Sequence, residues 1–230
     1  MQEPDIMDIL RKAWDNYKHN AKVLTLVATF GAAIPTIGYT IFTFYREITE
    51  IFDKSHAAAA SSTAPFVHLL FFIILCVFLY ATSLGLINIS NKALKNEPVT
   101  FKDAFLANNQ LEELFKAGGF LGLLILLGYI LCIIPGIILG FLFTFVPYVL
   151  IIFPRKTVGE SFTISRRLTT KYLKTTIIIA LILAAINTIA GASIIGIIIS
   201  MPVSVMTNTV LFTTLAEIEN NNDKANNILR

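Results

Sequence analysis

The sequence predicts an all-α, polytopic membrane protein, and three observations lead to that prediction. Of the 230 residues, 55% are hydrophobic and 14% are charged, whereas soluble domains contain about 25% charged residues. The apolar residues form long runs without polar–apolar alternation, and the mean hydropathy is +0.72. Because lipid offers the backbone no hydrogen bonds, such runs predict helices and not strands. With two cysteines and no glycine period, the composition excludes disulfide-stabilised, fibrous, disordered and soluble proteins.

Six apolar runs are predicted to span the bilayer, for which about 17–25 residues are typical. They cover residues 23–45, 66–90, 118–134, 137–153, 177–200 and 203–218. Three of them have only 16 or 17 residues. Hairpins that turn inside one leaflet are therefore the alternative to complete crossings.

The chain is predicted to form a single membrane domain of three helical hairpins with amphipathic helices on the cytoplasmic side. The expected order is an interfacial helix (1–21), a first hairpin (22–92), an amphipathic helix with a second hairpin (98–153), another with a third hairpin (154–218) and a polar tail (219–230).

The turns of the last two hairpins are assigned to prolines. Residues 118–153 contain no charge, and as one helix they would extend about 54 Å, too long for one crossing. Pro135 removes a helical donor and Gly136 permits a tight reversal, so one turn is expected there. Pro202 interrupts a second uncharged run, residues 175–216, and is expected to form the other turn.

The distribution of basic residues predicts that both termini are cytoplasmic. Sixteen of the 18 Lys and Arg residues fall in the amino-terminal segment, the second and fourth loops, and the tail. The other side has only Arg46 and Lys54. No cleavable signal is expected, because acidic Glu3, Asp5 and Asp8 occupy the place of a basic leader.

Three segments before the hairpins are predicted to be amphipathic helices at the membrane surface. The first carries Trp14 and Tyr17 on its apolar side, and we expect these rings at headgroup depth. The other two begin with the spacing of a capping box, at Thr100 and at Thr157. Their shared pattern, Thr-x-x-acid-small-Phe, suggests a threefold repeat, whereas the alternative is that loops between spans tend to be amphipathic and capped.

Distinctive motifs lie between residues 132 and 169. They are Cys132-Ile133-Ile134-Pro135-Gly136-Ile137-Ile138, Phe145-Val146-Pro147-Tyr148 and Gly159-Glu160-Ser161-Phe162-Thr163-Ile164-Ser165-Arg166-Arg167-Leu168-Thr169. With these motifs the chain resembles a large prokaryotic family of multi-pass membrane proteins of uncharacterised function, which is related to the membrane domain fused to some glycerophosphodiester phosphodiesterases. The resemblance implies six helices in a bacterial or archaeal cytoplasmic membrane. It does not imply catalysis, because the phosphodiesterase barrel and its acidic metal ligands are absent from the sequence.

The predicted spans offer no groups for acid–base or metal chemistry. None contains Asp, Glu, Lys or Arg except at its ends, although ion-coupled transporters normally keep such residues inside the bundle. Motifs of serine hydrolases, zinc hydrolases and phosphate-binding loops are also missing, and Cys76 and Cys132 lack metal-ligand spacing. We therefore expect no enzyme activity, no cofactor and no metal. A net charge of +3 gives no reason to expect nucleic-acid binding.

Polar and small residues inside the spans have two interpretations. Asn187 and Asn208 are expected to hydrogen-bond across the last hairpin, while Ser200 and Ser204 lie on a small-residue face suited to close helix packing. The alternative is that these residues line a ligand site. A second small-residue pair, Gly118 and Gly122, serves either internal packing or self-association.

The fourth loop carries the clearest functional signal, because six basic residues face a single acid there. Juxtamembrane Lys and Arg attract anionic lipid at about 1 kcal/mol each. The alternative is that the charges serve topology alone. The candidate headgroup-binding residues are Arg155, Lys156, Arg166, Arg167, Lys171 and Lys174.

These observations favour a non-enzymatic, multi-pass protein of a prokaryotic cytoplasmic membrane that organises or senses anionic lipid, or that scaffolds a membrane partner or a second copy of itself. The alternative is a transporter of small solutes or lipids. Its site would lie between the last two hairpins, where Asn187, Asn208 and the breaks at Pro135 and Pro202 offer helix ends to a ligand.

Overall fold

The computed structural model describes residues 3–52, 57–106, 108–131 and 133–228. Throughout these ranges the regular secondary structure is helical. Six helical stretches are long and apolar enough to cross a bilayer: Ile6–Phe44, Leu69–Leu94, Gln110–Ile130, Ile133–Ile152, Leu173–Ala190 and Ile195–Asn221. By helix length and hydropathy, therefore, the chain is an all-α, multi-pass membrane protein, as its composition predicts.

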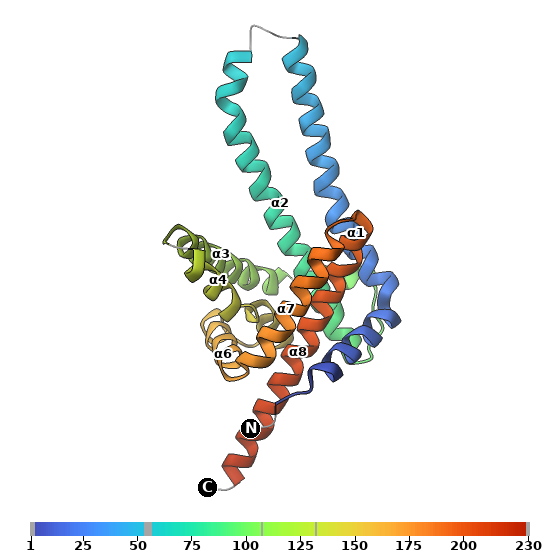
Figure 1. The fold of residues 1–230 in the computed structure, drawn as a ribbon, viewed down its shortest axis with the longest axis vertical. Coiled ribbons are helices and arrows are strands. Elements are labelled where there is room, and N and C mark those ends of the chain that lie inside the picture. Colours follow the sequence, from blue (N-terminus) through green and yellow to red (C-terminus); the bar gives the residue numbers. More distant parts are fainter. Residues whose placement is uncertain (1–2, 53–56, 107, 132, 229–230) are drawn as a thin grey trace.

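Helices α1 (Ile6–Phe52) and α2 (Ala57–Leu94) run side by side and project well beyond the rest of the molecule (Figure 1). Aromatic contacts join them, with ring centroids of Tyr39 and Phe71 5.5 Å apart. Many of their side chains, such as Phe44 and Phe72, are apolar and exposed. Such a surface is stable in lipid and unstable in water.

The amino-terminal amphipathic segment is not a separate interfacial helix, because it continues without interruption into the first span as part of α1. Its apolar side is inside the protein, where Ile9, Ala13 and Tyr17 are buried, and α1 packs on both α8 and α2. Of the two aromatic rings expected at headgroup depth, Trp14 is exposed and Tyr17 is inside the protein. The apolar side of this segment, which was expected to face lipid, therefore faces the protein interior.

A short 3-10 helix, η1 (Phe101–Ala104), connects α2 to α3 (Asn108–Leu131). Its capping box at Thr100 forms as predicted, with the Thr100 backbone N–H donating to the Asp103 carboxylate at 2.7 Å. At four residues, η1 is far shorter than the amphipathic helix expected in this loop.

The turn expected at Pro135 and Gly136 is wrong. Both residues lie in the first half of α4 (Ile133–Leu142), which starts two positions before Pro135. Proline is tolerated there because the first amides of a helix have no intrahelical acceptor. Gly136 instead allows α4 to approach α3 closely, because a Cβ on Gly136 would stand 2.8 Å from the ring of Tyr129 in α3.

The predicted fourth span is broken in two. Helix α4 ends at Leu142, and after a turn α5 (Val146–Ile152) begins, with Pro147 in its first turn. The carbonyl and amide groups freed at this break need partners, because unsatisfied backbone groups in an apolar interior cost several kcal/mol each.

The last three helices are α6 (Val158–Lys171), α7 (Leu173–Ala190) and α8 (Ile194–Ile228). The turn predicted at Pro202 is wrong, since α8 runs through Pro202 and the chain reverses at residues 191–193 instead. The Ser193 hydroxyl accepts from the Gly196 backbone N–H at 2.9 Å and so caps the start of α8. Residues 219–228, expected as a polar tail, continue this helix.

Helix α8 forms the centre of the molecule, because α1, α2 and α7 all pack against it. Its buried residues include Met206 and Phe212, and the Phe212 ring contacts Phe145 at a centroid distance of 5.6 Å. Helices α3 and α4 lie across the direction of α1 and α2, with α6 beneath them (Figure 1). The first residues of α1 and the end of α8 lie at one end of the molecule, opposite the projecting ends of α1 and α2 (Figure 1).

Candidate functional site

Within the predicted basic loop, residues 158–171 form helix α6, which lies beneath α3 and α4, on their side towards the amino-terminal segment and the end of α8 (Figure 1). Its predicted capping box is present: the Thr157 backbone N–H donates to Glu160 at 2.8 Å, and the Glu160 N–H donates to the Thr157 hydroxyl at 3.3 Å. The first of these bonds, together with the Lys156 ammonium, holds the pKa of Glu160 below its usual value. The cap therefore fixes where α6 begins.

The inner face of α6 is lined with hydroxyl groups that complete the broken fourth span. The Ser165 hydroxyl donates to the Leu142 carbonyl at 2.9 Å and accepts from the Phe145 N–H at 3.2 Å. The Thr169 hydroxyl donates to the same carbonyl at 3.3 Å. Because α6 satisfies the backbone at the break, it is an integral part of the helix bundle.

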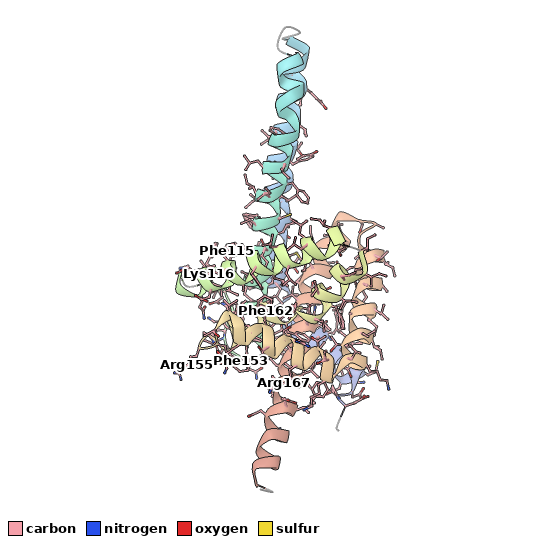
Figure 2. All side chains as sticks on the ribbon, turned by 90° about the vertical axis from the view of Figure 1, so that its left-hand side faces the viewer. Phe115, Lys116, Phe153, Arg155, Phe162 and Arg167 are labelled. Atoms are coloured by element: carbon pink, nitrogen blue, oxygen red, sulfur yellow. The ribbon has the colours of Figure 1, made fainter. Side chains whose placement is uncertain are left out.

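The aromatic side chains of this segment point into the protein. Phe162 packs between Phe120 and Phe143 at centroid distances of 5.4 and 4.9 Å, and Tyr172 is buried. Figure 2 shows Phe162 between α3 and α6, while Arg167 of α6 and Arg155, just before this helix, lie on its outer side. Only the basic side of α6 is thus available to lipid or solvent.

Four of the six candidate headgroup-binding residues form ion pairs within the protein. Lys156 pairs with Glu160 at 3.0 Å and Lys174 with Glu3 at 3.8 Å. Lys171 and Arg167 both pair with Glu219 of α8. Arg155 and Arg166 are exposed and make no ion pair with any residue that the structure describes.

Glu219 on α8 is the centre of this ion-pair network. Its side chain is 8% exposed and contacts the Lys171 ammonium and, at 3.5 Å, the Arg167 guanidinium. Glu219 is not among the site residues predicted from the sequence, although it lies one residue beyond the predicted last span and hence on the side of the basic loop. The pairing joins α6 to α8.

A second ion pair ties η1 to the end of α2. The Lys92 ammonium donates to Asp103 at 2.6 Å, and the Asn88 amide donates to the Asp103 carbonyl at 2.8 Å. Hydrogen bonds from Lys92 and from Thr100 lower the pKa of Asp103.

Between α6, α8 and the ends of α1, α2 and α5 lies a cavity of about 1050 Å³. Its wall combines charged side chains from all of the segments predicted to be cytoplasmic with apolar side chains from the helix ends. The charged residues are Lys12, Lys95, Lys156, Glu160, Arg167, Glu217 and Glu219, and the apolar ones are Leu94, Ile152, Phe153, Ile164, Leu168 and Ala216.

The polar residues of the last two helices do not pair as predicted. Asn187 donates to the Ser204 hydroxyl at 2.9 Å, whereas Asn208 hydrogen-bonds the Tyr148 hydroxyl of α5. Ser200 is buried, and its hydroxyl donates to a carbonyl of its own helix. The predicted hydrogen bond between Asn187 and Asn208 is therefore wrong, because each of the two residues bonds to another partner.

The prolines of the predicted solute site lie in different helix pairs. Pro135 is in α4, which packs on α3 and α6, and Pro202 is buried in α8, which packs on α7. Across the described ranges, no three His, Cys, Asp or Glu side chains are grouped as metal ligands. Cys76 is exposed, and Cys132 lies outside the described residues.

Comparison of the chain with protein-family models, with curated proteins and with solved structures finds no match.

Proposed function

We propose that this multi-pass protein is a non-enzymatic component of a prokaryotic cytoplasmic membrane that binds anionic lipid at the cytoplasmic leaflet and thereby organises it or senses it. The observation that carries the proposal is the placement of α6. Its inner face is anchored in the bundle. Arg166 of α6 and Arg155, three residues before its start, are exposed and have no ion-pair partner among the described residues. Anionic headgroups are the counterions that a membrane surface supplies to such cations.

Two further observations support this location and orientation. The segments rich in Lys and Arg gather at one end of the molecule, as expected if that end is cytoplasmic (Figure 1). The resemblance of residues 132–169 to a prokaryotic membrane family agrees with the same compartment. A scaffolding role toward a membrane protein or a second copy is compatible with this placement, because the lateral surfaces of α1, α2 and α3 are apolar and exposed.

The structure also identifies the variant that tests lipid binding. Arg167 and Lys171 hold Glu219, so replacing them would disturb the fold as well as the charge. Replacing Arg155 and Arg166 by glutamine changes the outer charge alone. At about 1 kcal/mol per charge, the double variant should retain phosphatidylglycerol or cardiolipin about 30-fold more weakly than the parent.

The measurement is native mass spectrometry of the protein released from mixed-lipid nanodiscs at low and high salt. The control is R46Q/K54Q, which removes the same charge from the two basic residues on the predicted opposite side. High salt should reduce the difference between parent and variant, because exposed charges are screened. Equal retention of anionic lipid by parent and R155Q/R166Q at low salt would refute the proposal.

A further inference from the structure

The cavity beside α6 has the amphipathic character of a lipid site and not that of a site for a soluble ion. Its apolar residues come from α6 and from the ends of α2, α5 and α8, and Phe153, which directly follows α5, is 42% exposed. Its charged residues occupy the same wall. At about 1050 Å³, its volume is at the upper end of the usual range for small-molecule sites. It has room for a headgroup and the adjoining part of an acyl chain.

The charges of the wall are nearly balanced. Four cations (Lys12, Lys95, Lys156 and Arg167) face three acids (Glu160, Glu217 and Glu219), which gives a net charge of +1. Four of these charges are already engaged within the protein, because Lys156 pairs with Glu160 and Arg167 with Glu219, itself held by Lys171. A wall of this kind does not favour a ligand that carries only negative charge.

After these internal pairs are set aside, two cations and one acid remain for a ligand. Lys12, Lys95 and Glu217 are exposed, and none forms an ion pair with another residue in the described ranges. The nearby Asn91 is buried yet lines the cavity, so its amide adds a donor and an acceptor. This set complements a phosphate, at the two lysines, next to an ammonium, at the glutamate.

We propose that the cavity binds a zwitterionic phospholipid whose headgroup contains a phosphate and a primary ammonium. Lys12 and Lys95 hold the phosphate, Glu217 accepts the ammonium, and the apolar wall covers the start of an acyl chain. This site is separate from the outer edge of α6 at Arg155 and Arg166, where anionic lipid is proposed to bind. The protein would then recognise two classes of lipid at one membrane surface.

The test uses the full-length protein in nanodiscs that contain equal amounts of phosphatidylethanolamine and phosphatidylglycerol, with retained lipid read by native mass spectrometry. The parent should retain phosphatidylethanolamine. E217Q, which removes the ammonium partner, should retain it about fivefold less, by the estimate of about 1 kcal/mol per charge. Its retention of phosphatidylglycerol should not fall.

Two controls separate the cavity from general charge effects. E113Q removes an acid of α3 that pairs with Lys116 and does not line the cavity, so it should leave both lipids unchanged. R155Q/R166Q should weaken retention of phosphatidylglycerol without altering that of phosphatidylethanolamine. K12Q/K95Q, which removes the phosphate partners, should lower retention of phosphatidylethanolamine with Glu217 intact.

Three results would overturn the inference. One is equal retention of phosphatidylethanolamine by the parent, E217Q and K12Q/K95Q. Another is a parent that retains phosphatidylglycerol alone. The third concerns free phosphoethanolamine, which has the headgroup without chains: if it binds the solubilised protein as tightly as the lipid does, the apolar wall contributes nothing and the ligand is a soluble one.

Discussion

Asp103 makes the stability of the contact between η1 and α2 depend on pH. Its carboxylate accepts hydrogen bonds from the Lys92 ammonium and from Thr100, and these lower its pKa in the folded protein. A carboxyl group with a lowered pKa stabilises the fold above its unfolded value, about 3.9, and loses that contribution as the pH falls through the folded value. The ion pair is therefore intact at neutral pH and lost in acid.

Replacing Asp103 by asparagine should remove this part of the pH dependence. At pH 7, D103N should unfold at a lower temperature than the parent, because Lys92 loses its anionic partner. Below about pH 4 the difference should shrink, since the parent carboxylate becomes protonated. The measurement is thermal unfolding of the detergent-solubilised protein from pH 7 to pH 3, and a constant difference over that range would contradict the assignment.

Other residues show why proline and glycine were assigned wrong roles from the sequence. Pro135 is typical of a turn, but in the first turn of α4 its missing N–H breaks no helical hydrogen bond. Pro202 is accommodated inside α8 because neighbouring helices bury it. The observed turn has its own signal in the sequence, namely Gly191 at the end of α7 and Ser193 as the cap of α8.

At the scale of elements, α6 was the best predicted part of the candidate site. Its start follows from the capping box, a local interaction that residues 157 and 160 contain in full. What α6 contacts could not be predicted in the same way. Ser161, Ser165 and Thr169 recur at spacings of four and so mark one polar stripe, but only the structure shows that this stripe faces a break in another helix.

This arrangement predicts that Ser165 matters more for stability than its small size suggests. In S165A the buried Phe145 N–H loses its acceptor, and Leu142 retains only Thr169 as a side-chain donor. An unsatisfied buried backbone group costs about 1–3 kcal/mol, so S165A should be destabilised by that amount.

The matched control is T163A on the same helix. Thr163 is exposed and bonds only to a carbonyl of α6 itself, so its replacement should change the stability by less than about 0.5 kcal/mol. Chemical denaturation in mixed micelles would measure both variants. Similar values for S165A and T163A would show that the break is satisfied in some other way.

At the scale of the whole molecule, composition and run length predict the all-α class and six apolar stretches long enough to span the membrane. They do not predict how these stretches are arranged. Apolar surface can face lipid or another helix at similar cost, so nothing in the runs themselves indicates that α1 packs its first turns on α8. The close packing of α3 on α4 depends on contacts such as that of Gly128 with Gly136, which no periodicity reveals.

The gathering of basic segments at one end predicts a topology with both termini in the cytoplasm. Single cysteines would replace Gln2, Ala58 and Ala225 in a protein whose Cys76 and Cys132 have been changed to alanine. In intact cells a membrane-impermeant maleimide should label position 58 alone, and permeabilised cells should allow labelling of all three. External labelling at position 2 or 225 would overturn the orientation and, with it, the assignment of α6 to the cytoplasmic leaflet.

The break between α4 and α5 also determines the order in which the protein can be completed during synthesis. The groups that satisfy it belong to Ser165 and Thr169, which leave the ribosome after the broken segment itself. Until then, the Leu142 carbonyl and the Phe145 amide must stay hydrated or be held by the insertion machinery. Residues 133–152 therefore reach their final depth only once α6 has emerged, and a chain that stalls before residue 165 leaves this segment unfinished in the membrane.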